Sequence, residues 1–186
     1  MRLLAIDPSL TSTGYAYTLG VGAITGTIEP KKLVGARRLC DIRDEIDGMM
    51  EEIEPALVVM EKLIGGPNRE TTIHQAELIG VLKVLFHEKG KRILLVPPST
   101  LKLFATGKGN ADKDEMRVAA GKERGKFFQS HDEADAFHLL QMGIGALDRR
   151  SLPRERRHYK HAALRKCEVI DSDGARVSVE TVFNGR

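Results

Sequence analysis

Two short apolar runs in this chain of 186 residues each end at a carboxylate. The first covers residues 3–6 and ends at Asp7, and the second covers residues 56–60 and ends at Glu61. A strand exposed on one face alternates apolar and polar residues, whereas a continuous apolar run is typical of a strand buried on both faces. Helices must then cover both sides of the sheet, so these runs favour a mixed α/β fold.

The remaining pattern supplies the other elements of such a fold. Residues 1–7, 14–19 and 23–28 are β-rich and joined by short turns, which predicts an antiparallel meander. Helical spacing of apolar residues predicts helices near 37–54, 70–89 and 132–148, with shorter ones ending near 104 and 123 and strands at 56–60 and 92–96. This order predicts a five-stranded mixed sheet flanked by helices over residues 1–148. Residues 149–186 are expected to be an appendage made of a basic segment and a β-hairpin around Asp173-Gly174.

The composition excludes several classes of protein. Hydrophobic residues make up 41% and charged residues 30% of the chain, which argues against wholesale disorder. No run approaches the roughly 18 apolar residues of a membrane span, so we expect a cytoplasmic protein without a membrane partner. Cys40 and Cys167 lack the spacing of a metal site and are expected to be buried thiols.

Positive charge is concentrated near the C-terminus rather than spread evenly. Eight cationic residues stand against the single acid Glu155 in this stretch: Arg149, Arg150, Arg154, Arg156, Arg157, Lys160, Arg165 and Lys166. This composition is typical of a surface that contacts phosphates, and it is equally typical of a solvated, flexible connector. The sequence leaves both interpretations open.

Four acids occupy the ends of the predicted core elements. If the strands that end at Asp7 and Glu61 are neighbours, their carboxylates emerge at the same sheet edge, and Asp132 and Asp135 share one face of the last core helix. Buried carboxylates are costly unless they bind a cation, and oxygen ligands suit Mg²⁺ or Mn²⁺. Each acid alone has a simpler explanation: Asp7 could open a turn, Glu61 could pair with Lys62 or Arg69, and Asp132 could cap its helix.

Four ordered sequence blocks carry a resemblance to a known family. They are Leu4-Ala5-Ile6-Asp7-Pro8-Ser9 with Thr13-Gly14-Tyr15, then Val59-Met60-Glu61, then Thr106-Gly107-Lys108-Gly109-Asn110-Ala111-Asp112-Lys113, and Asp132-Glu133-Ala134-Asp135-Ala136. Over residues 3–148 the chain resembles the RuvC-type Holliday junction resolvases of the ribonuclease H-like superfamily. The resemblance implies that Asp7, Glu61, Asp132 and Asp135 are the catalytic metal-binding acids. It also implies that Lys113 is the basic residue beside the scissile phosphate.

The same resemblance implies a reaction and its partners. The protein is expected to be a homodimeric endodeoxyribonuclease that uses two Mg²⁺ ions per site, with Mn²⁺ as a substitute, and no nucleotide cofactor. It would resolve four-way DNA junctions by paired symmetric nicks that leave 5′-phosphates, and the helix near 70–89 is a candidate interface. The cations expected to contact DNA are Lys102, Lys108, Lys113, Arg69, Arg154, Arg156 and Arg157.

The chain also departs from the family pattern. Ser9 stands where the family usually has glycine, and Leu63-Ile64-Gly65-Gly66 stands where an aromatic wedge often follows the second acid. Residues 149–186 have no clear counterpart in the cellular enzymes, which would fit a divergent, phage-encoded variant. His131 could be a further ligand or proton carrier, a histidine that supports the ligands without binding metal itself, or merely an exposed histidine.

Other functions remain alternatives to the narrow one. The main alternative is a nuclease with broader activity on forks, flaps or three-way junctions. An ATPase of the actin and sugar-kinase type would need a second phosphate hairpin and a duplicated domain, for which the chain is too short. A DNA-binding module without catalysis is disfavoured because all four acids are present.

Overall fold

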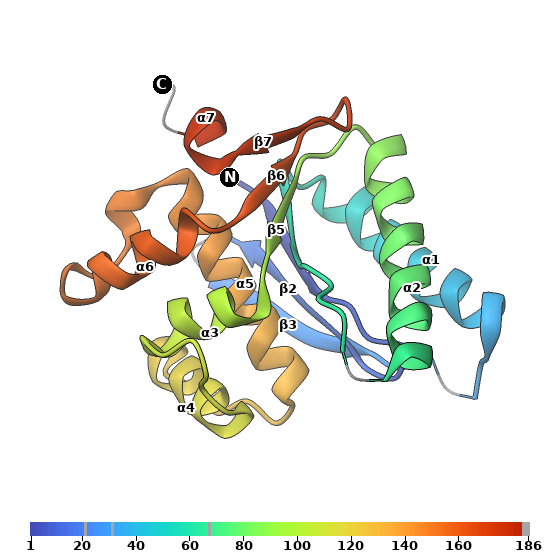
Figure 1. Ribbon diagram of the computed structural model, residues 1–186, viewed down its shortest axis with the longest axis horizontal. Helices are drawn as coiled ribbons and strands as arrows, with labels where there is room; N and C mark the ends of the chain where they lie inside the picture. The colour runs from blue at the N-terminus through green and yellow to red at the C-terminus, as the bar shows by residue number, and fades with distance from the viewer. Residues whose placement is uncertain (21, 31, 67, 184–186) are drawn as a thin grey trace.

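The computed structural model describes residues 1–20, 22–30, 32–66 and 68–183, and it shows a central sheet with helices on both faces (Figure 1). The strands are β1 (Leu3–Asp7), β2 (Thr13–Leu19), β3 (Gly22–Ile28), β4 (Leu57–Glu61), β5 (Ile93–Val96), β6 (Glu168–Ile170) and β7 (Arg176–Ser178). The α-helices are α1 (Gly35–Ile53), α2 (Arg69–Glu88), α3 (Pro98–Thr106), α4 (Lys113–Arg124), α5 (His131–Leu147), α6 (Arg157–Leu164) and α7 (Val179–Phe183). Two 3-10 turns, η1 (Arg149–Ser151) and η2 (Arg154–Arg156), lie between α5 and α6. None of the helices in these ranges is long and apolar enough to cross a membrane.

The pairing of the strands brings the two acid-ended runs together. The sheet order is β3-β2-β1-β4-β5-β6-β7, and β1, β2 and β3 form the predicted antiparallel meander. Strands β1 and β4 pair in parallel, with Ile6 opposite Met60. Asp7 and Glu61 each follow that pair by one residue, so both leave the sheet at the same edge, as expected.

The two apolar runs are buried on both faces of the sheet. Leu4 and Ile6 of β1 pack with α1 and α2 on one side, whereas Leu3 and Ala5 face α5 on the other. Figure 1 shows α1 and α2 on one side of the sheet and α3, α4, α5 and α6 on the opposite side. The continuous apolar character of β1 and β4 therefore follows from contact with helices on both sides.

The C-terminal hairpin enlarges the sheet to seven strands instead of the expected five. Strand β6 pairs antiparallel with β5, with Ile93 opposite Ile170, and β7 pairs with β6. Without this pairing β5 would be an edge strand with unpaired backbone groups. The basic segment before the hairpin folds into η1, η2 and α6 and so is not a flexible connector. Residues 184–186, the end of the expected appendage, lie outside the described residues.

The two cysteines differ in their surroundings. Cys167 is buried, and burial raises the pKa of its thiol to about 12. Cys40 is exposed, so the prediction of a buried thiol was wrong for this residue. The apolar stripe of α1 that faces the sheet runs through Ile42, Ile46 and Met50, and Cys40 is not part of it.

His138 is a fully buried histidine on α5. Its Nε2–H donates to the carbonyl oxygen of Met116 at 3.0 Å, while Nδ1 has no hydrogen-bond partner in the described part of the chain. Burial lowers the pKa of the imidazole to about 4, mainly because the charged form would lose its hydration. His138 is therefore neutral in the folded protein at neutral pH.

This burial predicts a loss of stability in mild acid. The unfolded chain protonates this imidazole near its ordinary pKa of 6.5, whereas the folded chain does so only near a pKa of about 4. The free energy of unfolding should therefore fall by about 2 kcal/mol between about pH 7 and about pH 5 through this group. Urea unfolding of wild-type protein and His138→Gln at both pH values measures the difference. Replacing the exposed His87 by Gln should retain the wild-type pH dependence, and an equally steep dependence in His138→Gln would contradict the prediction.

Candidate active site

The turn after β1 closes without help from the carboxylate of Asp7. The buried Thr13 hydroxyl donates to the Ser9 carbonyl oxygen at 2.6 Å and accepts from the Ser9 amide at 3.1 Å. A Gln75 side-chain amide donates to the Pro8 carbonyl oxygen and ties the turn to α2. Asp7 is thus held at the strand end by a turn that other side chains stabilise, and the turn-opener explanation does not account for it.

Among the described residues, Glu61 forms an ion pair with neither of the partners considered for it, Lys62 and Arg69. Lys62, the proposed partner, extends instead to Glu168 on β6, with 2.6 Å between Nζ and Oε1. A cavity of about 300 Å³ lies beside Glu61, and Leu63, Ile64 and Gln75 are among its lining residues. Glu61 therefore borders an open hollow at the sheet edge.

The first turn of α5 presents the other two acids. Ser130 caps this helix by accepting from the amides of Asp132 at 3.1 Å and Glu133 at 3.5 Å. The capping explanation for the Asp132 side chain is therefore wrong, because Ser130 fills that position. Helix α5 packs along β1 and β2, which directs Asp132 and Asp135 toward the strand end that carries Asp7.

The acids influence one another's protonation. Burial raises the pKa of Asp7 well above its usual value, and Glu61 and Asp132 raise it further. Burial likewise raises the pKa of Glu61, and it raises the pKa of Asp135 to about 7, with Asp7 and Asp132 adding to the shift of Asp135. Repulsion between carboxylates is strong where water is largely excluded, and it weakens as their separation increases. The structure thus brings Asp7, Glu61, Asp132 and Asp135 together as one electrostatic unit.

The donor set fits a hard divalent cation, although the side chains do not form a closed cage. Among residues 1–20, 22–30, 32–66 and 68–183, no three His, Cys, Asp or Glu side chains converge tightly enough to hold a metal ion as they stand. One oxygen of Asp135, Oδ1, is buried without a hydrogen-bond partner in these ranges. A buried, unpartnered carboxylate oxygen is costly, and contact with a cation offsets that cost. The acids would have to move closer together to share one ion.

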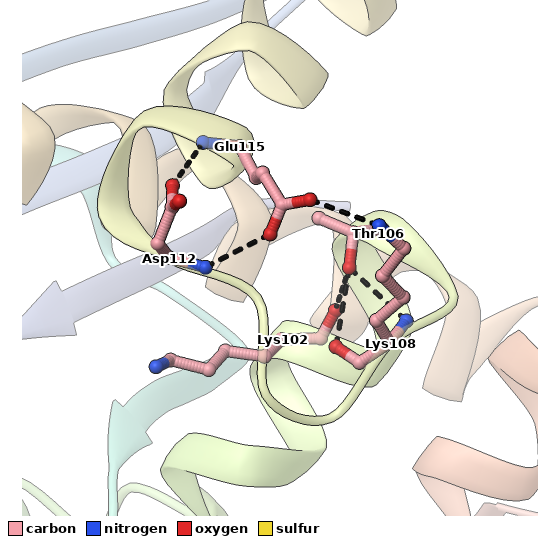
Figure 2. A network of polar contacts seen from close by, with 5 residues as sticks. All are labelled: Lys102, Thr106, Lys108, Asp112 and Glu115. Carbon is pink, nitrogen blue, oxygen red and sulfur yellow. Dashed lines mark hydrogen bonds and ion pairs between the residues drawn. The ribbon is translucent and has the colours of Figure 1, made fainter.

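Two lysines, one in α3 and one at the start of α4, lie near the four acids. Lys113, the first residue of α4, lowers the pKa of Asp7, Glu61 and Asp135, and Lys102 of α3 lowers the pKa of the last two. The start of α4 is fixed by a capping box, because the Glu115 amide donates to Asp112 at 2.8 Å and the Asp112 amide donates to Glu115 at 3.0 Å (Figure 2). Lys113 was predicted from the resemblance, whereas Lys102 was expected only as a DNA contact. No sequence feature indicated that Lys102 lies near the acids, because its position depends on how α3 packs against the rest of the protein.

His131 is placed between the two helix starts. Its Nδ1 lies 3.2 Å from the carbonyl oxygen of Lys113, and its Nε2 lies 4.0 Å from Asp114. The imidazole therefore joins the first residue of α4 to the first residue of α5. This contact favours a positioning role over that of an additional metal ligand.

The remaining cations expected to contact DNA are spread over several elements. Lys108 pairs with Glu115 at 3.0 Å, and Arg69 is the first residue of α2. Arg154 and Arg156 lie in η2, and Arg157 begins α6 and donates to the Leu152 carbonyl oxygen at 3.0 Å. Only Lys102 and Lys113 of the predicted set act on the carboxylates.

Gly14 sets how closely α5 can approach the sheet. It pairs with Asp7 across β1 and β2, and a Cβ at this position would lie 2.1 Å from the carbonyl oxygen of Asp132. No side chain other than hydrogen fits that space, so the contact requires glycine. Gly14 is therefore a positioning residue for Asp132 that residue type and spacing did not single out.

Comparisons with known proteins identify one family. The family model described as crossover junction endodeoxyribonuclease RuvC matches residues 3–136. The RuvC of Frankia casuarinae is 33% identical over 77% of this chain and 87% of its own length, and that of Corynebacterium glutamicum is 27% identical over 77% and 68%. The Thermus thermophilus RuvC structure superposes with a TM-score of 0.66 at 21% identity, covering 78% of this chain and 95% of that one. A complex of the same protein with a Holliday junction substrate gives 0.68 at 20% identity, covering 78% and 94%. These structures confirm the ribonuclease H-like fold class.

Because the contact at Gly14 is tight, we predict that adding a methyl group there disrupts the arrangement of the carboxylates. Gly14→Ala should push the first turn of α5 away from β2 and lower the free energy of unfolding by about 2 kcal/mol. It should also weaken Mn²⁺ binding to the carboxylates at least tenfold, as measured by calorimetry. Gly48→Ala in α1 is the matched control, because a Cβ there meets nothing within 4 Å and should be neutral or stabilising. Unchanged stability and unchanged Mn²⁺ affinity in Gly14→Ala would contradict this account.

Proposed function

Because the chain belongs to the RuvC family of crossover junction endodeoxyribonucleases, we propose that it resolves four-way DNA junctions by paired nicks that leave 5′-phosphates. The observation that carries this proposal is the electrostatic unit at the ends of β1, β4 and α5, where burial and mutual repulsion raise the pKa of three acids. Lysines at its border supply the positive charge that a phosphodiester requires. The solved complex of the Thermus relative with a Holliday junction supports the same substrate.

The nucleases of this family depend on metal, and the expected ion here is Mg²⁺ at two per site, with Mn²⁺ as a substitute. Asp7, Glu61, Asp132 and Asp135 would hold the ions, because they offer oxygen donors only. Bound Mg²⁺ would supply a nucleophilic water and stabilise charge on the leaving 3′ oxygen. The buried Oδ1 of Asp135 is the donor most in need of such a partner.

The chain's own residues position the phosphate and balance its charge. Lys113 would neutralise charge that develops on the scissile phosphate, and its backbone is held by the His131 contact to its carbonyl oxygen. Lys102 borders Glu61 and Asp135 and would hold the DNA strand on the same side. Together these lysines place the phosphodiester against the carboxylates before any bond changes.

Symmetric cutting of two strands requires two sites, so we expect a homodimer. Helix α2 is the candidate interface, because Ile73 and Val84 on it are 49% and 57% exposed. Leu63 to Gly66 replace an aromatic wedge next to Glu61, and this difference favours keeping a broader branched-DNA nuclease as the second candidate. We expect either enzyme to act in the cytoplasm without a nucleotide cofactor.

Replacing Asp7 by Asn should separate cutting from binding. The amide cannot supply the charge that the site needs, so nicking of a four-way junction should fall by at least about a thousandfold. Junction affinity should stay within about threefold, because phosphate contacts from lysine and arginine dominate it. Gel assays of labelled junctions with Mg²⁺, and without it for binding, measure both. Glu52→Gln, an exposed acid on α1, is the matched control, and wild-type cutting by Asp7→Asn would overturn the assignment.

The choice between the two candidate substrates is tested with a panel of branched DNAs. A four-way junction, a three-way fork, a flap and a linear duplex are incubated with wild-type protein and Mg²⁺, and initial rates are compared. Paired nicks at symmetric positions of the four-way junction, at least about tenfold faster than on other branches, are expected because two sites related by a two-fold axis match that substrate. Comparable rates on all branches would replace the narrow function with the broader one.

A further inference from the structure

A cavity of about 310 Å³ lies on the outer side of the α3–α4 loop, separate from the carboxylates. Lys108 of that loop, Lys122 of α4, Arg156 of η2 and Tyr159 of α6 contribute to its walls. We propose that this cavity is a second phosphate-binding subsite, which holds the backbone of a DNA arm as it leaves the cleavage site. This inference rests on the proposed function and assigns a role to the C-terminal segment.

The charges around the cavity are unbalanced in favour of an anion. Glu115 pairs with Lys108 at 3.0 Å, and Glu123 contacts Lys160 at 3.2 Å and Arg156 at 4.0 Å. Lys122 adds a further cation to these pairs. Among the residues that line the cavity, Lys108, Lys122 and Arg156 stand against one carboxylate, Glu115, and the excess positive charge faces a hollow that a phosphodiester can enter.

The same carboxylates hold the cations in place. Lys160 is fully buried, with Glu123 on one side and the ring centre of Phe104 4.2 Å away on the other, so α6 is fixed against α3 and α4. Arg156 precedes α6 by one residue and shares Glu123. The packing of α6 therefore holds the backbone of Arg156 beside the cavity.

The loop that carries Lys108 is equally well fixed. The Thr106 hydroxyl donates to the Lys102 carbonyl oxygen at 2.8 Å and accepts from the Lys108 amide at 3.1 Å (Figure 2). Gly107 has a φ of +82°, and the Tyr159 ring lies against it, 3.6 Å from where a Cβ would be. The cavity is therefore preformed by contacts between the loop and α6.

The α3–α4 region carries both the lysines that act on the carboxylates and a lysine that lines the cavity. In Figure 2 the Lys102 amine points away from the loop, while the Lys108 amine points toward Glu115 on its other side. Lys102 and Lys113 act on the acids, so one side of this loop faces the cleavage site and the other faces the cavity. A DNA backbone that passes the first pair of lysines can reach Lys108 and Lys122 next.

One wall of the cavity lies outside the part shared with the family. The family model matches residues 3–136, whereas Arg156 and Tyr159 come from the segment after α5. The subsite thus combines a loop within the matched part with a wall that lies after it. Its ligand is the phosphodiester backbone of duplex DNA.

The test measures junction binding by full-length protein that carries Asp7→Asn to prevent cutting. Fluorescence anisotropy measures the affinity for a four-way junction whose arms are about two helical turns long. Adding Lys122→Glu should weaken binding of this junction about tenfold near 0.1 M salt. It should also reduce the slope of log affinity against log salt by about one. Arg156→Gln should act in the same direction, and thermal melting confirms that each variant is folded.

Arg37→Glu is the matched control, because Arg37 is an exposed cation on α1, which covers the opposite face of the sheet. An unchanged salt slope in Lys122→Glu, or an equal loss in Arg37→Glu, would each overturn the subsite. Wild-type affinity for linear duplex equal to that for the junction, with the Lys122→Glu loss still present on long DNA, would instead contradict junction resolution and uphold the subsite.

Discussion

Parallel pairing of β1 with β4 is the constraint on which the rest of this molecule depends. It places Asp7 and Glu61 at one sheet edge, and it requires helices on both faces because neither strand has a polar side. Helix α5 is one of those helices, so the same helix that covers the core also places Asp132 and Asp135 near this edge. Asp7, Glu61 and Asp135 are poorly hydrated for the same reason, and the resulting rise in the pKa of these three carboxyls is a consequence of packing as much as of chemistry.

Much of this arrangement could be predicted because its causes are local or nearly so. Continuous apolar runs identified β1 and β4, helical spacing identified α1, α2 and α5, and the three-residue separation of Asp132 from Asp135 placed both on one face. These patterns need only the periodicity of the backbone. The resemblance then supplied Lys113, which composition alone could not distinguish from the other lysines.

What could not be predicted depends on contacts between distant parts of the chain. Gly14 is required by a backbone atom of Asp132, and nothing near Gly14 in the sequence signals that contact. The reach of Lys102 to Glu61 depends on how α3 docks, and the pairing of β6 with β5 depends on the return of the chain across the sheet. The basic segment was ambiguous for the same reason, because the burial of Lys160 between Glu123 and Phe104 is a tertiary contact.

The short C-terminal hairpin also determines where the sheet stops. Strands β6 and β7 have only three residues each, and β7 now forms the outer border instead of β5. A chain trimmed after α5 would uncover the apolar β5, whose unpaired amides and carbonyls could recruit a strand from another molecule. The hairpin thus covers β5. Strand β7 has only three residues, one of them the charged Arg176, so this edge of the sheet offers few backbone groups for pairing with another molecule.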